Sequence, residues 1–412
     1  MFFKGKKILI LILVVSCLTV YSKQKADYTI TAMDLQYGVE SYDNGQGIKE
    51  NFFRIRVLPE FQLLPDTRLG LDLSFIFDKD GSIKTDHYQG DNGFWSKINF
   101  LEHGVYKSEK YIRAGFLEKI TLGNGSIFNN YSNKTRYPEK PKKSGLIARI
   151  ENKHDDGYEF MMDDLSKPSI FAIRKFIMPV DDVVIGLTYA MDRKPDSIHY
   201  TSESVKIYGL DFITPIYLGF GKNIYLYEDL TRIKGHGSAF TTGLKYDSNS
   251  DFKAKVEFNS YSSNFIPKYF DTYYEAEKDK KFQKLRYIDM TGGKRIRSLN
   301  LFAQKQFGSF LGVELFTEYF DRNDLSPTLK LNVGLKDWIL PEGLKVDWEY
   351  YNKNVDYSNF HANRKNSDVY IKTDFTYITP QGAELTVTRK RLVNEKGNVE
   401  YLTSFMTGFK LK

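Results

Sequence analysis

The sequence predicts an all-β protein, folded as a single antiparallel up-and-down barrel of about 16–20 strands. Three observations support this fold class. Apolar and polar residues alternate with period two, in segments of about ten residues. Short and long connections between these segments alternate along the chain. Aromatic residues make up 15% of the chain, a level that favours strands. Long stretches with the spacing of an amphipathic helix are missing.

The first 22 residues predict a secretory signal peptide, which leaves 23–412 as the barrel domain. A group of lysines precedes an apolar run from Ile8 to Val15, and this run is too short to span a membrane as a helix. Two processing sites stay open. Ordinary cleavage near Lys23 is preferred, but a lipobox-like stretch would instead leave Cys17, the single cysteine, lipidated. Either way, the mature protein leaves the cytoplasm.

The alternation is clearest in six segments, each with one apolar and one polar face. They are 69–78, 252–259, 329–336, 344–351, 369–377 and 399–411. The segment from Gly157 to Met178 is poorly patterned, which leaves the strand number open within the stated range.

The connections predict a meander with short turns at one end and long loops at the other. Short connections are expected at Pro65–Arg68, Thr214–Pro215, Ser248–Ser250 and Thr379–Gly382. Long ones are expected at 79–96, 123–143, 229–236, 264–295 and 353–365. The glycine-rich stretch 122–126 is interpreted as a turn at the rim of the barrel.

Together, the leader, the alternating strands and the alternating loop lengths resemble a porin-like outer-membrane β-barrel of a diderm bacterium, from about Tyr28 to the end of the chain. The resemblance implies short periplasmic turns, long outer loops and a location in the bacterial outer membrane. It also implies contact with outer-membrane lipid and lipopolysaccharide, and with the barrel-assembly machinery. The apolar faces would then meet lipid, because each Lys or Arg near the bilayer midplane costs roughly 2–4 kcal/mol.

Other classes of function find little support in the residues. Net charge is +7, from 59 basic and 52 acidic residues that are spread along the chain, so no nucleic-acid partner is predicted. The six histidines are scattered without zinc spacing, and no metal or cofactor is predicted. His236 lies close to Ser238, but no helix follows to form a nucleophile elbow. We therefore predict no catalytic site and no enzyme.

The predicted function is passive diffusion of small hydrophilic solutes, because a barrel of about 16 strands or more is wide enough for an aqueous channel. The lumen-lining candidates are Lys253, Lys255, Glu257, Lys330, Lys336, Lys345, Asp347, Glu349, Lys372 and Asp374. Two alternatives stay open. One is a loop-plugged barrel that acts as an adhesin or receptor, and the other is a secreted soluble all-β binding protein.

The segment 264–295 is the candidate constriction loop. It is the longest connection and is rich in aromatic residues, which folding into the lumen would bury, offsetting the entropy lost on ordering the loop. Its candidate charges are Glu275, Glu277, Lys280, Lys281, Lys284 and Arg286. An outward flap or partner-binding surface is the competing interpretation.

Overall fold

The computed structural model describes residues 29–43, 49–83, 97–134, 143–152, 155–195, 203–219, 221–248, 252–262, 264–287, 295–322, 327–336, 339–352, 369–380, 382–393 and 399–411. The signal peptide predicted for 1–22, with Cys17, lies outside the described residues. Most of the long connection predicted at 79–96, and all of the one predicted at 353–365, also lie outside the described residues. Among the described residues, no helix has the length and apolar character needed to cross a membrane.

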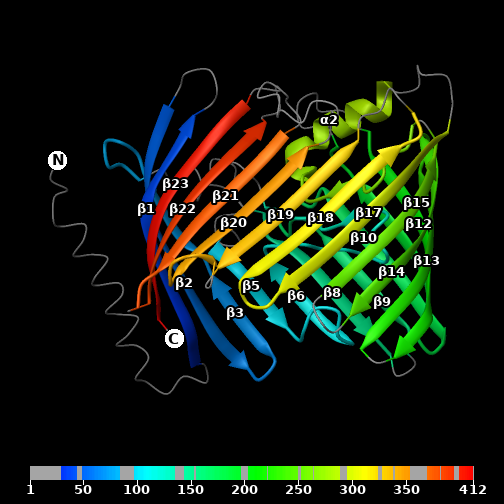
Figure 1. Ribbon diagram of the computed structural model, residues 1–412, viewed down its shortest axis with the longest axis horizontal. Coiled ribbons are helices and arrows are strands. Elements are labelled where there is room, and N and C mark those ends of the chain that lie inside the picture. The colour runs from blue at the N-terminus through cyan, green and yellow to red at the C-terminus, as the bar shows by residue number, and fades with distance from the viewer. Residues whose placement is uncertain are drawn as a thin grey trace.

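The described strands form one closed antiparallel barrel (Figure 1). Each strand pairs with the next one along the chain, and the last strand returns to the first, with Leu411 opposite Met33. Two short segments, β3 and β4, are pieces of a single strand interrupted at Asp72, so 21 paired segments make 20 barrel strands. The strand number lies within the predicted range, and the predicted fold class is confirmed.

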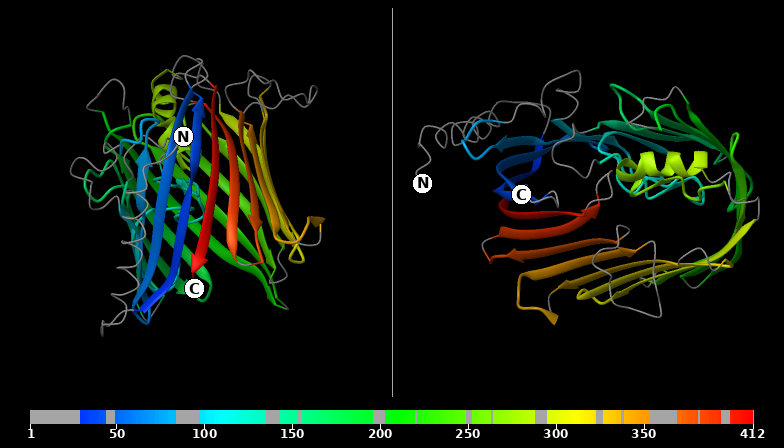
Figure 2. Two further views of the ribbon diagram at one scale, coloured as in Figure 1. Left: turned by 90° about the vertical axis from the view of Figure 1, so that its left-hand side faces the viewer. Right: turned by 90° about the horizontal axis from the view of Figure 1, so that it is seen from above.

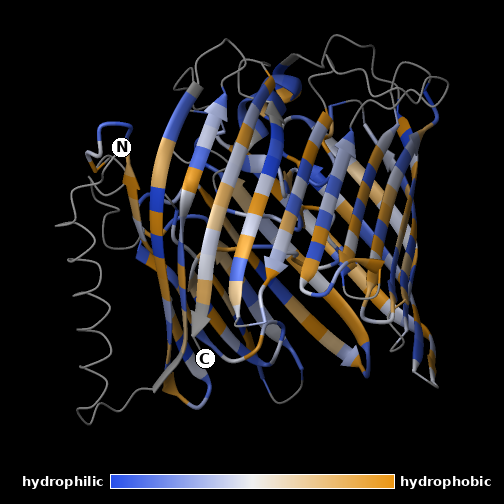
Figure 3. Ribbon diagram, turned by 60° about the vertical axis from the view of Figure 1, so that its left-hand side comes forward, coloured by the Kyte–Doolittle hydropathy of each residue, from blue (hydrophilic) through white to orange (hydrophobic). Residues whose placement is uncertain are grey.

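The barrel strands are β1 (Thr29–Asp43), β2 (Lys49–Leu64), β3 (Thr67–Leu71), β4 (Leu73–Phe77), β5 (Ile98–His103), β6 (Lys110–Gly115), β8 (Gly145–Glu151), β9 (Gly157–Met162), β10 (Ile170–Val180), β11 (Val183–Asp192), β12 (Val205–Gly219), β13 (Lys222–Ile233), β14 (Gly237–Ser248), β15 (Phe252–Tyr261), β17 (Ile296–Phe307), β18 (Leu311–Phe320), β19 (Thr328–Lys336), β20 (Leu344–Asn352), β21 (Val369–Ile378), β22 (Ala383–Val393) and β23 (Val399–Leu411). Hydropathy alternates along them, as the sequence predicts (Figure 3).

Short connections gather at one end of the barrel, where β1 begins and β23 ends. Two predicted connections were wrong. Thr214 and Pro215 lie inside β12, next to a bulge that lets the proline sit in a strand, and the turn comes at Gly221, whose φ of 70° suits glycine. The segment from Asp229 to Ile233 is strand, so the loop expected at 229–236 shrinks to three residues.

Two connections from the opposite end fold back into the barrel. One joins β6 to β8 and contains β7 (Phe128–Asn129), and the other joins β15 to β17 and contains β16 (Phe270–Asp271) and helix α2 (Tyr274–Tyr287). Viewed along the barrel axis, α2 lies inside the ring of strands (Figure 2). The sequence analysis missed this helix, because its apolar side consists of only a few residues.

Candidate functional site

An inner lobe, formed by residues 116–134 and 264–287, occupies part of the lumen. Its two halves are joined by the parallel pairing of β7 with β16. The rings of Phe128 and Phe270 stack at this junction with centroids 4.3 Å apart, and Tyr131 and Tyr274 pack against Phe270. The halves are distant in sequence but form one aromatic-centred unit.

The inner lobe packs against one side of the barrel, the lumen faces of β8–β13, which we call the covered wall. Tyr274, Phe282 and Leu285 of α2 are buried in a cluster that includes Ile170 and Ile207 of this wall. The lumen faces of β17–β21, which we call the open wall, meet this cluster among the described residues only at the long-loop end, through Ile296 of β17 and the partly buried Phe320 of β18. The lumen therefore has one side filled like a protein core and one side lined by polar groups.

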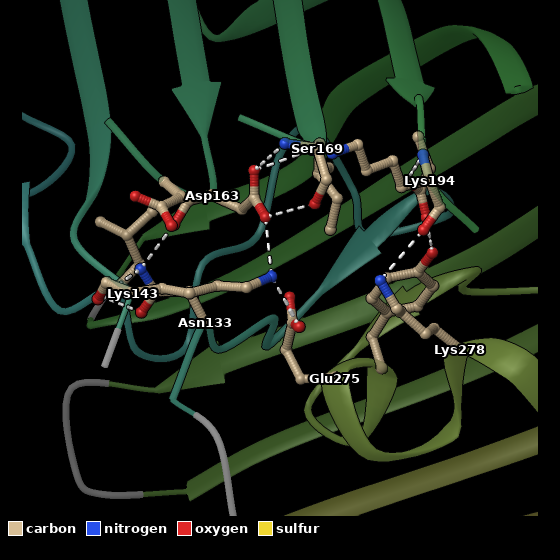
Figure 4. Close-up of polar contacts among 12 residues, drawn as sticks. Asn133, Lys143, Asp163, Ser169, Lys194, Glu275 and Lys278 are labelled. Atoms are coloured by element: carbon tan, nitrogen blue, oxygen red, sulfur yellow. Dashed lines mark hydrogen bonds and ion pairs between the residues drawn. The ribbon is translucent and has the colours of Figure 1, made fainter. Parts of the chain in front are cut away.

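A buried ion cluster attaches the lobe to the covered wall (Figure 4). Lys143, just before β8, donates to Asp163 at 2.8 Å and to Glu275 at the start of α2 at 2.7 Å. Burial alone would lower the pKa of Lys143, but Glu275 and Asp163 raise it above its ordinary value. Burial would raise the pKa of Asp163, whereas Lys143 holds it below its usual range. Lys143 and Asp163 are therefore ionised together at neutral pH.

The other half of the lobe is fixed by polar contacts deeper in the lumen. Asn124 donates to Asp229 of β13 at 3.0 Å, and beside it Gly123 has a φ of 56°. A Cβ at Gly123 would lie 3.0 Å from the carboxylate of Asp211, so a side chain does not fit there. The prediction that this glycine-rich stretch is a rim turn was wrong, because it lies against β12 and β13 inside the barrel.

The helix presents its charges to the remaining lumen. Glu277, Lys280, Lys281 and Lys284 follow the i, i+3, i+4, i+7 spacing of one helical face and line a cavity of about 660 Å³ between the lobe and β15–β19. We call this the upper cavity, because it lies toward the long-loop end. The acidic first turn and basic last turn of α2 also suit the helix dipole.

The lobe reaches the open wall through Tyr273, just before α2. Its hydroxyl donates to Glu349 of β20 at 2.7 Å, and its ring stacks on Tyr351 with centroids 4.5 Å apart. The edge of Tyr370 completes this contact at 5.5 Å. Tyr273 therefore connects the lobe to the open wall, whereas the Lys143 ion cluster connects it to the covered wall.

A second cavity, of about 890 Å³, extends along the open wall toward the short-turn end. We call it the lower cavity. It shares Asn130, Thr272, Phe302, Glu314 and Lys330 with the upper cavity, so the two meet at these five residues. We call this meeting point the waist.

The two faces of the barrel wall differ sharply. Large apolar side chains such as Val256, Phe258, Leu315 and Phe375 are exposed on the outside, as a lipid-facing belt requires. Their polar neighbours point inward, where Glu257 is buried among lysines. The chain is a closed 20-strand antiparallel β-barrel with the apolar outer belt and polar lumen of a membrane-spanning barrel.

Comparison with known proteins finds distant structural similarity alone. No protein-family model and no curated protein matches the chain. Among solved structures, Pseudomonas aeruginosa OpdL is similar with a TM-score of 0.40 and 11% identity, over 94% of this chain and 99% of that one. OccK3 (OpdO) of the same organism has a TM-score of 0.39 and 11% identity, over 92% and 94% of the two chains. These likenesses are distant, and the assignment rests on the closure and the faces of this barrel.

The structure distributes the predicted lumen residues over three cavities. Lys330, Lys336, Lys345, Asp347, Glu349, Lys372 and Asp374 line the lower cavity. Lys255 and Glu257 line the upper one, and Lys253 and Lys255 line a third cavity of about 380 Å³ beneath the lobe at the short-turn end. Their part in conduction remains a prediction.

The predicted constriction charges separate into two groups. Glu277, Lys280, Lys281 and Lys284 face the upper cavity. Glu275 instead turns to the covered wall and pairs with Lys143, while Arg286 pairs with Glu203 near the rim at 2.8 Å. The helix causes this separation, because successive side chains point in directions about 100° apart around its axis. Charges that are close in sequence therefore face different surroundings.

Several residues at the waist were not among the site residues predicted from the sequence. Glu314 stands between Val313 and Leu315, so the period-two pattern of β18 could have identified it. Asn130 and Thr272 belong to irregular segments that meet only after folding, where Thr272 donates to the backbone of Asn130 at 2.9 Å. No sequence signal connects them.

Proposed function

We propose that this protein is an outer-membrane channel for passive diffusion of small hydrophilic solutes, with the inner lobe as its constriction. The observation that carries the proposal is the pair of connected cavities along the open wall, lined by lysine, aspartate, glutamate, asparagine and glutamine side chains. Such a path keeps a solute hydrated or hydrogen-bonded, and lumen charge and width then set its selectivity.

The lobe narrows the lumen and leaves the polar side of the barrel uncovered. Its apolar residues face the covered wall, and its charged helix face and the waist residues face the open one. We further expect contact with lipopolysaccharide at the outer rim and insertion by the barrel-assembly machinery.

Single-channel recording in planar bilayers tests the proposal. The full mature chain, with its folding confirmed by heat-modifiable gel mobility, should give discrete ohmic steps in potassium chloride. Folded protein that inserts into the bilayer but carries no current would overturn the channel. It would favour a plugged barrel that acts through its outer loops.

A further inference from the structure

We propose that the ion pair between Glu314 and Lys330 at the waist is the element that sets the ion preference of the channel. This inference rests on the proposed function. It assigns selectivity to a neighbouring strand pair and not to the charged face of α2. Nζ of Lys330 lies 3.2 Å from Oε1 of Glu314, and Asn332 donates to the same oxygen at 2.9 Å.

The ion pair lies where the two cavities meet. Among the described residues, these two charges are the ones that line both the upper and the lower cavity. A solute that moves between the cavities passes them, whereas the helix face borders the upper cavity alone. On the lobe side, the residues shared by the two cavities are Asn130 and Thr272, which are uncharged.

The side chains of Lys330 and Glu314 keep 23% and 29% of their surface exposed, so both charges are in contact with the solvent of the cavities. A partly exposed pair in contact with water holds its partners weakly, so a passing ion can compete for either charge.

An unsatisfied acceptor supports the same location. Oδ1 of Asn332 is buried and has no hydrogen-bond partner among the described residues, although Nδ2 of the same side chain is bound to Glu314. Buried polar atoms of this kind usually bind water or a ligand. A water at the edge of the lower cavity, which Asn332 also lines, would satisfy it beside the ion pair.

Reversal potentials in a salt gradient test the inference. At low ionic strength, Glu314→Gln should lower the cation-to-anion permeability ratio about threefold and Lys330→Gln should raise it about threefold, since one unit charge a few ångströms from the path is gained or lost. The double variant should return close to the wild-type ratio. Lys280→Gln, on the helix face, is the matched control and should change the ratio by less than half as much.

Unchanged ratios in both waist variants, together with a large change for Lys280→Gln, would overturn the inference and assign selectivity to α2. A wild-type protein without current would instead contradict the proposed function itself, so the two failures are distinct.

A second route avoids altering the pair. Thr272→Cys introduces a thiol on the exposed lobe side of the waist, in a chain whose single native cysteine lies in the predicted leader. A negatively charged methanethiosulfonate should raise the cation preference and a positively charged one should lower it. If the cation-to-anion permeability ratio is the same before and after complete modification of the thiol, this would also contradict the inference.

Discussion

The covered wall and the open wall both carry lysine, arginine, aspartate and glutamate on their lumen faces, but the surroundings of these charges differ. Arg174 of the covered wall is only 4% exposed and bonds to both Glu159 and Asp211. Lys330 of the open wall faces both cavities and pairs with the partly exposed Glu314. Charges of the first kind hold the lobe side of the barrel together, and charges of the second kind remain available to solutes.

The largest expected difference between the walls is in stability. Arg174→Met should destabilise the barrel by about 3–5 kcal/mol, because it removes the ion-pair partner of the buried Asp211 carboxylate and one of the two partners of Glu159, which keeps Arg149. Lys330→Met should change stability by about 0–1 kcal/mol, as for other solvated pairs. Urea titration of the protein folded in lipid vesicles measures both, and similar losses for the two variants would erase the distinction between the walls.

Packing of the lobe gives the next prediction. Phe282→Ala should remove about 3–5 kcal/mol of packing between α2 and the covered wall, since this ring is buried. The lobe should then be cleaved faster by protease while the barrel stays intact. Lys280→Ala, two residues earlier on the lumen face, should leave cleavage unchanged; faster cleavage in that variant too would point to a helix held by its lumen face.

The outer surface of the open wall offers a third comparison. Val346→Arg should weaken insertion by roughly 2–4 kcal/mol, because it places a charge in the lipid-facing belt. Lys345→Ala, at the neighbouring position on the lumen face, should insert normally. Refolding yield from urea into lipid compares the two, and equal yields would contradict the assignment of faces.

The smallest expected effect is that of pH on the ion pair between Lys143 and Asp163, which attaches the lobe to the covered wall. The lowered pKa of Asp163 means that its contribution is complete above the unfolded value near ~4 and is lost as pH falls through the still lower folded value. The raised pKa of Lys143 means that its contribution is complete below ~10 and is lost at higher pH. The contribution of this pair to the protease resistance of the lobe, measured as the difference between wild type and Asp163→Asn, should therefore be constant between about pH 5 and pH 9. A difference that changes between pH 6 and pH 7 would contradict this assignment.

The comparison also explains which parts of the fold were predictable. Strands of the open wall have water on one side and lipid on the other, so β19, β20 and β21 alternate clearly and were identified from their pattern. On β10, by contrast, inward Ile170 and Ala172 are buried under the lobe, while outward Ile173 faces lipid. Both faces are apolar there, period two is weakened, and this is why the segment 157–178 was poorly patterned.

The candidate site was predictable to the same extent. Lys330 was found because its strand alternates, and Glu314 could have been found in the same way. The lobe side of the waist depends on contacts between segments far apart in sequence, which no local pattern encodes. The helix was missed because packing of Tyr274, Phe282 and Leu285, and not a continuous apolar stripe, stabilises it.

The union of the two lobe halves has a consequence for the order of assembly. Tyr131 and Glu275, which are hydrogen-bonded at 2.7 Å, lie 144 residues apart, and strands β8–β15 come between them. Closing so long a loop is unfavourable until the intervening hairpins have paired and brought its ends together. The lobe therefore docks after this arc of the barrel has formed, and a nascent barrel passes through a stage in which its lumen is wider than in the finished protein.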